Sequence, residues 1–152
     1  MSIPDGIICS INSESISKKE HIFFKQTNPL GFILFSRNFN NKRQLTELIN
    51  ELKNLTLNKS PFIFIDQEGG RVQRLKNSNF TIFPEQRFFG EIYKKNKEKS
   101  KKLSYLNAYL LANELKNVGI DINFSPVCDL YFNYANDIIG DRSFSSDPSI
   151  VK

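Results

Sequence analysis

The sequence has no tryptophan, one methionine, one histidine and two cysteines. The cysteines, Cys9 and Cys128, lie far apart, and neither belongs to a CxxC motif or to a cysteine and histidine cluster. This spacing argues against a structural zinc site, and we expect neither a metal nor an organic cofactor. Two reduced, buried thiols are expected, as in cytoplasmic proteins. His21 falls within a predicted helix and is expected to be a surface or packing residue.

Long apolar runs and phosphate-binding motifs are also missing. Residues 1–15 (MSIPDGIICSINSES) lack a basic region followed by an apolar segment, so they predict neither a signal peptide nor a membrane span. The cytoplasm is therefore the expected location, with no membrane partner. Neither GxGxxG nor GxxxxGK[ST] occurs, so no phosphate loop is predicted.

The chain is long enough for one globular domain, which we expect to span residues 1–152. Its net charge is +5, and the densest basic run is KKNKEKSKK at 94–102. No aromatic side chain is interleaved with these lysines, as a nucleic-acid surface would require. The run is interpreted as the solvated start of a helix, and no nucleic-acid partner is predicted.

Short apolar runs alternate with helical patterns along the chain. The expected strands are 6–10, 31–35, 61–65 and 120–126, and the expected helices are 13 or 15 to 26, 41–55 and 97–118. Each strand looks apolar on both faces and is followed by a helix or a loop, which is typical of a parallel sheet covered by helices. The pattern alone leaves two α/β architectures open, a doubly wound open sheet and a (β/α)8 barrel.

Both architectures bind ligands at the C-terminal ends of their strands, and polar residues gather there in this sequence. The stretch 66–74 (DQEGGRVQR) directly follows a predicted strand. The Asp66 carboxylate can accept hydrogen bonds from hydroxyl groups, and Arg71 and Arg74 carry rigid donor forks. The alternative is a salt-bridged loop in which one of the arginines neutralises Asp66 or Glu68.

Four segments together resemble the family 3 glycoside hydrolases, and within them the β-N-acetylhexosaminidase branch, the cytoplasmic enzymes of peptidoglycan recycling. They are GFILFSRNF (31–39), DQEGGRVQR (66–74), INFSPVCDL (122–130) and IIGDRSFSSDP (138–148), in the family's order and spacing. The resemblance implies a (β/α)8 TIM barrel, and the four β/α units counted here would be its N-terminal half.

The resemblance also implies roles for six residues. The contacts with the N-acetylglucosamine at the cleavage point would come from Asp66, Arg74 and Arg142. Three further residues would support them without touching the sugar: Glu68, Arg71 and Asp129. Without the resemblance, Arg142 would be interpreted as the partner of Asp141 or Asp137.

The family's chemistry implies catalytic residues that this chain does not contain. Retaining hydrolysis uses an aspartate nucleophile, and this branch pairs a histidine with an aspartate as acid and base. Both groups lie beyond position 152 in the family, so no catalytic residue is assigned here. A barrel of this type needs about 250 residues and eight strands. Asp147-Pro148 also indicates a helix that starts just before the sequence stops.

We therefore expect the N-terminal half of a β-N-acetylhexosaminidase, inactive alone, whose partners are the missing half of the barrel and an N-acetylglucosaminide or muropeptide. Two alternatives stay open: a half-barrel subunit completed by a second chain, and a non-catalytic sugar-binding remnant. A β-glucoside or β-xyloside is the alternative substrate.

Overall fold

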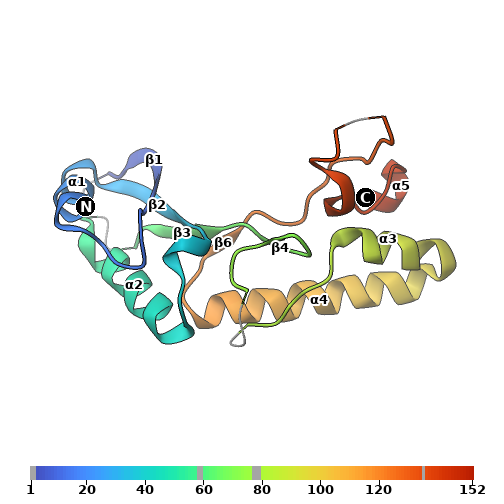
Figure 1. The fold of residues 1–152 in the computed structure, drawn as a ribbon, viewed down its shortest axis with the longest axis horizontal. Coiled ribbons are helices and arrows are strands. Elements are labelled where there is room, and N and C mark those ends of the chain that lie inside the picture. The colour runs from blue at the N-terminus through green and yellow to red at the C-terminus, as the bar shows by residue number, and fades with distance from the viewer. Residues whose placement is uncertain (1–2, 58–59, 77–79, 135) are drawn as a thin grey trace.

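The computed structural model describes residues 3–57, 60–76, 80–134 and 136–152. Its main sheet has four parallel strands in the order β1-β2-β3-β6. They are β1 (Asp5–Ser10), β2 (Pro29–Leu34), β3 (Phe62–Ile65) and β6 (Ile122–Asn123). Each strand of this sheet adds next to the one before it, as in a barrel, and the predicted α/β fold with a parallel sheet is confirmed (Figure 1).

Three helices connect these strands, α1 (Lys18–Thr27), α2 (Lys42–Leu55) and α4 (Lys97–Asn117). They pack on one face of the sheet, where Phe32 of β2 and Ile63 of β3 are in register and buried. Phe24 of α1 meets Phe32 edge to face, and the apolar stripe of α2 completes this core with Leu45, Leu48, Ile49 and Leu52. The 3.6-residue spacing of that stripe is what predicted α2 from sequence.

The opposite face of the sheet is apolar and partly exposed within the described part of the chain. Ile8, Gly31 and Phe62 are in register across three strands, so they share this face. Ile8, Phe62 and Phe124 are 44%, 45% and 47% exposed, and Phe124 stacks on Phe64. The prediction that every strand is buried on both faces is therefore wrong: both Ile7 and Ile8 of the edge strand β1 are exposed, and so is Phe62 of β3.

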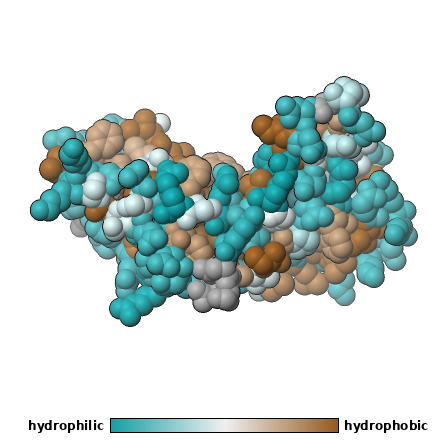
Figure 2. Space-filling model, in the orientation of Figure 1, coloured by the Kyte–Doolittle hydropathy of each residue, from teal (hydrophilic) through white to brown (hydrophobic). Residues whose placement is uncertain are grey.

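Figure 2 shows the same arrangement at the surface, where apolar side chains gather at the left over α1 and β1. The large exposed residues of these two elements are Ile7, Ile8, Ile22 and Phe23. Phe23 is 49% exposed, whereas the adjacent Phe24 is buried against the sheet. The upper side of the molecule is hollowed between this region and the C-terminal segment (Figure 2).

Helix α1 begins later than predicted, with Ser17 rather than Ser13 or Ser15 as its N-cap. The Glu20 backbone N–H donates to the Ser17 hydroxyl oxygen at 3.2 Å, and the Ser17 N–H donates to the Glu20 carboxylate at 2.9 Å. These reciprocal bonds form a capping box. Partial burial raises the pKa of Glu20, but hydrogen bonds from Ser17 and from the Asn12 N–H lower it further than burial raises it.

We expect Ser17→Ala to lower the free energy of unfolding by about 1 kcal/mol, the usual contribution of an N-cap. A carboxylate with a lowered pKa stabilises the fold above its unfolded pKa, about 4.3, and loses this contribution as the pH falls through its folded value. The difference between the two proteins should therefore shrink below about pH 4. Urea unfolding at several pH values measures it, with Ser15→Ala as the control; equal losses in both variants would contradict the assignment of the cap.

Several shorter elements surround the strand ends. The ones not predicted are the antiparallel pair β4 (Gln67–Gly69) and β5 (Val72–Gln73), helix α3 (Gln86–Lys95), and the 3-10 turns η1 (Ser36–Asn38) and η2 (Gly140–Arg142). Gly69 and Gly70, at φ +102° and +54°, make a tight turn in backbone conformations that other residues resist. Helix α5 (Pro148–Val151) begins as expected, with Asp147 as N-cap and Pro148 in its first turn.

The cysteines differ from the prediction of two buried thiols. Both are free, and Cys9 is partly buried, which raises the pKa of its thiol. Cys128 is exposed, because it lies in the loop that leaves β6 rather than in the core. His21 is exposed on α1, in line with the prediction of a surface residue. In the described ranges, no helix combines the length and hydrophobicity that a membrane span needs.

Candidate functional site

The site is built where β3 ends, and an asparagine from the neighbouring strand fixes the backbone there. The Gln67 N–H donates to the Asn123 side-chain oxygen at 2.9 Å, and the Asn123 amide nitrogen donates to the Gln67 carbonyl at 2.8 Å. This two-point contact holds the residue directly after Asp66. The direction of the Asp66 side chain is therefore set by β6 as well as by β3.

Buried glutamine side chains then hold the β4–β5 turn in place. Gln67, 1% exposed, accepts hydrogen bonds from the backbone N–H groups of Arg74 and Leu75 at 2.8 and 3.1 Å. Gln73 donates to the Thr81 carbonyl at 2.7 Å and accepts from the Phe83 N–H at 3.1 Å. The density of polar residues in DQEGGRVQR therefore has in part a structural cause. The side chains of both glutamines make hydrogen bonds with backbone groups that have no backbone partner in this turn.

Asp66 and Arg74 form the first ion pair of the site. An Arg74 guanidinium nitrogen lies 2.8 Å from an Asp66 carboxylate oxygen, and both side chains are partly exposed. The guanidinium also lies 5.7 Å from the centre of the Phe35 ring, which follows β2. The pairing that the residues alone suggested is therefore present, and it leaves part of each polar group open to solvent.

Glu68 and Arg142 form the second pair, a bidentate one. The Arg142 Nε and Nη2 atoms donate to the two Glu68 carboxylate oxygens at 2.9 and 2.8 Å. The Glu68 side chain is only 4% exposed, against 25% for Arg142. The hydrogen bond to Glu68 is the main cause that raises the pKa of Arg142, and the charges of Asp129 and Asp66 add to it.

This pairing corrects the interpretation of Arg142 from the residues alone. Asp141, one of the expected partners of Arg142, instead accepts a hydrogen bond from Arg71 Nε at 2.7 Å. Arg71 Nη2 donates to the backbone carbonyls of three successive residues, 137 to 139, at 2.8, 2.8 and 3.2 Å. Arg71 therefore binds the loop that carries Arg142, rather than Asp66 or Glu68.

Asp129 joins the site through its backbone. It is exposed, and its carbonyl oxygen accepts a hydrogen bond of 2.6 Å from the Ser143 hydroxyl. Ser143 is fully buried and follows Arg142 directly. The structure thus brings all six predicted residues into one connected cluster: two ion pairs, with Arg71 and Asp129 holding the segment of Arg142.

Three residues of the cluster were not singled out from sequence: Gln67, Asn123 and Arg87. Arg87 of α3 donates to the carbonyls of Gly140 and Ser143, on either side of Arg142. Gln67 and Asn123 lie in the quoted motifs but act through amide groups whose partners are far away in sequence. Of the three, only Gln67 could have been suspected from sequence, because it belongs to the dense polar run that follows a buried strand.

The arrangement suits a neutral ligand rich in hydroxyl and amide groups, because partly open carboxylate and guanidinium groups face one another. Among the described residues, no group of histidine, cysteine and acidic side chains could hold a metal ion.

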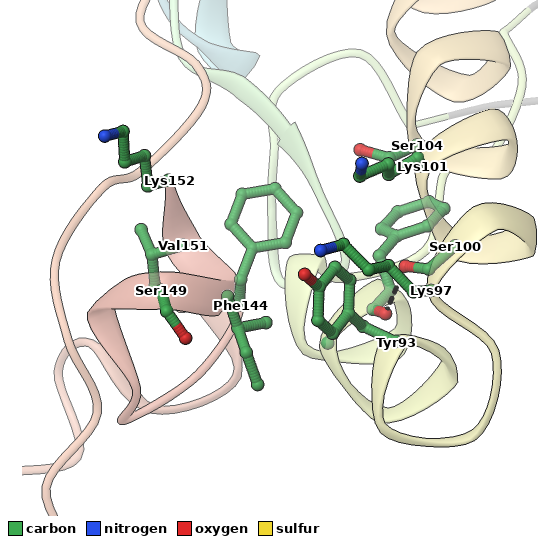
Figure 3. Close-up of a pocket in the computed structure, with 12 residues that line it drawn as sticks. Tyr93, Lys97, Ser100, Lys101, Ser104, Phe144, Ser149, Val151 and Lys152 are labelled. Atoms are coloured by element: carbon green, nitrogen blue, oxygen red, sulfur yellow. Dashed lines mark hydrogen bonds between the residues drawn. The ribbon is translucent and has the colours of Figure 1, made fainter.

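A separate cavity of about 430 Å³ lies between α3, α4 and α5, lined by Tyr93, Lys97 and Phe144 among others (Figure 3). None of the six predicted residues lines that cavity.

The sequence pattern of the glycosyl hydrolase family 3 N-terminal domain matches residues 8–152. The chain belongs to this family. Its sheet and helices are accordingly part of a (β/α)8 TIM-barrel fold, as the resemblance implied. The polar cluster lies at the C-terminal ends of β3 and β6, the end at which such barrels carry their active sites.

Solved structures of family 3 proteins share the fold. NagZ from Neisseria gonorrhoeae, determined in complex with N-trifluoroacetyl-D-glucosamine, is 36% identical with a TM-score of 0.90, over 98% of this chain and 44% of that one. A family 3 β-N-acetylglucosaminidase from Paenibacillus sp. is 29% identical with a TM-score of 0.84, over 95% of this chain and 27% of its own.

Curated relatives carry the name β-hexosaminidase. The protein from Hydrogenovibrio crunogenus is 38% identical over 152 residues, and the one from Bordetella avium is 33% identical over 148. The alignments cover 99% and 97% of this chain but only 42% of either relative. The chain therefore spans less than half the length of the relatives it matches.

Proposed function

We propose that this chain forms part of the sugar subsite of a β-N-acetylhexosaminidase, which removes terminal β-linked N-acetylglucosamine. The observation that carries the proposal is the paired cluster of Asp66 with Arg74 and Glu68 with Arg142, at the active-site end of a family 3 barrel. The solved relatives support the N-acetylated sugar over a β-glucoside or β-xyloside, since one holds N-trifluoroacetyl-D-glucosamine and another is a β-N-acetylglucosaminidase. A muropeptide of peptidoglycan recycling would be the natural substrate, and the cytoplasm its compartment.

Three side chains would contact the sugar: Asp66, Arg74 and Arg142. Asp66 would accept hydrogen bonds from sugar hydroxyls, and Arg74, already held by Asp66, would donate to the same hydroxyls. Arg142 would donate from the other side, with Glu68 fixing its orientation. Arg71 and Asp129 would act on the Arg142 segment and not on the sugar.

The reacting groups would come from polypeptide beyond the part of the relatives that this chain matches. Retaining hydrolysis needs a carboxylate to attack the anomeric carbon and an acid to protonate the leaving oxygen. This chain would raise the rate of the reaction by holding the sugar in a fixed position, through hydrogen bonds that strengthen in the transition state. No cofactor or nucleic acid has a role in this scheme.

N-Acetylglucosamine should bind to this chain with millimolar affinity, since an incomplete site offers few contacts to offset the ordering of its loops. Titration followed by NMR should shift the amide signals at 66–74 and 140–143, whereas glucose at equal concentration should shift them less. The chain alone should not hydrolyse an aryl N-acetylglucosaminide. The proposal fails if saturating sugar leaves both segments unchanged; hydrolysis by the chain alone would refute the location of the reacting groups.

A further inference from the structure

Helix α3 packs directly against the segment that carries Arg142, and a glycine makes the contact possible (Figure 1). A Cβ atom on Gly90 would overlap the carbonyl oxygen of Phe144. Backbone therefore lies against backbone here, and any side chain at position 90 would push the helix and the segment apart. Ser100 of α4 donates to the Phe89 carbonyl at 2.7 Å, which ties α3 to the longer helix behind it.

Arg87 lies one turn before Gly90 and holds both ends of the short turn η2. Its Nη2 atom donates to the Gly140 carbonyl at 2.8 Å, and its Nε atom donates to the Ser143 carbonyl at 3.3 Å. Its guanidinium carbon lies 4.1 Å from the centre of the Tyr131 ring. Arg142 lies between the two carbonyl groups that Arg87 binds.

Arg87 is held by carbonyl groups and an aromatic ring. Within the described ranges, no carboxylate oxygen lies within 4.0 Å of the Arg87 guanidinium nitrogens. A planar fork of donors reaches two carbonyls and an aromatic face together, which a lysine ammonium on a flexible stem does not reproduce. Arg71 binds the preceding part of the same loop, through the carbonyls of residues 137 to 139.

We propose that Arg87 is a positioning residue that fixes Arg142 in its bidentate pair with Glu68. The close contact that Gly90 allows between α3 and the Arg142 segment brings Arg87 within reach of that segment. Arg71 and Arg87 then hold successive parts of the loop, residues 137 to 139 and residues 140 and 143, so that Arg142 is presented to the ligand in a fixed orientation. The consequence for sugar affinity rests on the proposed function; the positioning itself does not.

The test follows the Arg142 Nε–H signal by NMR, which should exchange slowly because this atom donates to Glu68 at 2.9 Å. In Arg87→Lys and Arg87→Gln, this exchange should become roughly tenfold faster or more, the size of a lost hydrogen bond to a charged group. Gly90→Ala should act in the same direction. Arg43→Lys makes the same chemical change at an exposed pair on α2 and should leave the signal unchanged.

The Arg37 Nε–H, which donates to the Ile11 carbonyl at 2.9 Å, reports on general loosening. Unchanged Arg142 exchange in both Arg87 variants, or an equal acceleration at Arg37, would overturn the proposal, because Arg87 would then only stabilise the fold. The dissociation constant for N-acetylglucosamine should rise in step with Arg142 exchange. If the unmodified chain binds no sugar while Arg142 exchange still responds to the Arg87 variants as expected, the result would count against the proposed function and support the positioning role.

Discussion

Alanine at position 66 should abolish detectable binding of N-acetylglucosamine to this chain. In the longer protein that we propose, turnover should fall by roughly two to three orders of magnitude, which corresponds to several kcal/mol of transition-state hydrogen bonding. The reason is twofold. The variant loses the carboxylate that accepts from sugar hydroxyls, and it releases Arg74, which the carboxylate holds at 2.8 Å.

A second substitution separates these two effects. Asp66→Asn keeps an acceptor oxygen near Arg74 but removes the charge, so its loss should be smaller than that of alanine. Glu47→Ala, which breaks an exposed ion pair on α2, is the control for the loss of an acidic side chain. Turnover is measured with an aryl N-acetylglucosaminide and binding by NMR titration. Near-normal turnover in Asp66→Ala would show that Asp66 does not contact the sugar.

The elements that sequence predicted well are those whose signal is local. Helices α2 and α4 have apolar residues at helical spacing, and strands β2 and β3 are short runs of large apolar side chains. Helix α3 was not predicted because Pro84 and Gly90 are residues of the kind that usually mark a loop. The glycine is there for a tertiary reason, the close approach of Phe144, which no local pattern contains.

The start of α1 could have been predicted. Ser13, Ser15 and Ser17 lie just before the helix, but only Ser17 has a glutamate three residues later, which is the pattern of a capping box. The exposure of Ile8 and Phe62 could not have been predicted from their own sequence, because an apolar residue facing a covered side of a sheet and one facing an uncovered side look alike.

The residues of the polar cluster could be singled out from sequence, but the long-range pairs among them could not. Motif positions singled out Asp66, Arg74 and Arg142, and Asp66 pairs with Arg74 only eight residues away. The pairs Arg71–Asp141 and Arg142–Glu68 instead depend on contacts across 70 or more residues. Arg71 and Asp141 are near the other acids and arginines in sequence, so charge alone allows several pairings. Chain topology selects one of them, because the fold brings η2 to the β4–β5 turn, where Arg142 contacts Glu68 and Arg71 contacts Asp141.

Removal of the Glu68 side chain should destabilise the fold far more than removal of a surface carboxylate. Glu68→Ala leaves Arg142, whose side chain is 25% exposed, without its bidentate partner, and we expect a loss of about 3 kcal/mol in the free energy of unfolding. The exposed pair Arg43–Glu47, at 88% and 62% exposure, should contribute about 0.5 kcal/mol or less.

A double-mutant cycle on Glu68 and Arg142, with a second cycle on Arg43 and Glu47, measures the difference. Urea unfolding of the single and double alanine variants should give a coupling of about 2 kcal/mol for the first pair. The same variants decide what Glu68 does. If it orients Arg142, sugar binding and stability should fall together in Glu68→Ala, and Arg142→Ala should make the further loss of Glu68 nearly without effect on binding. Lost sugar binding at unchanged stability would instead mean that Glu68 contacts the sugar itself, because a carboxylate that only holds an arginine cannot be removed without releasing it.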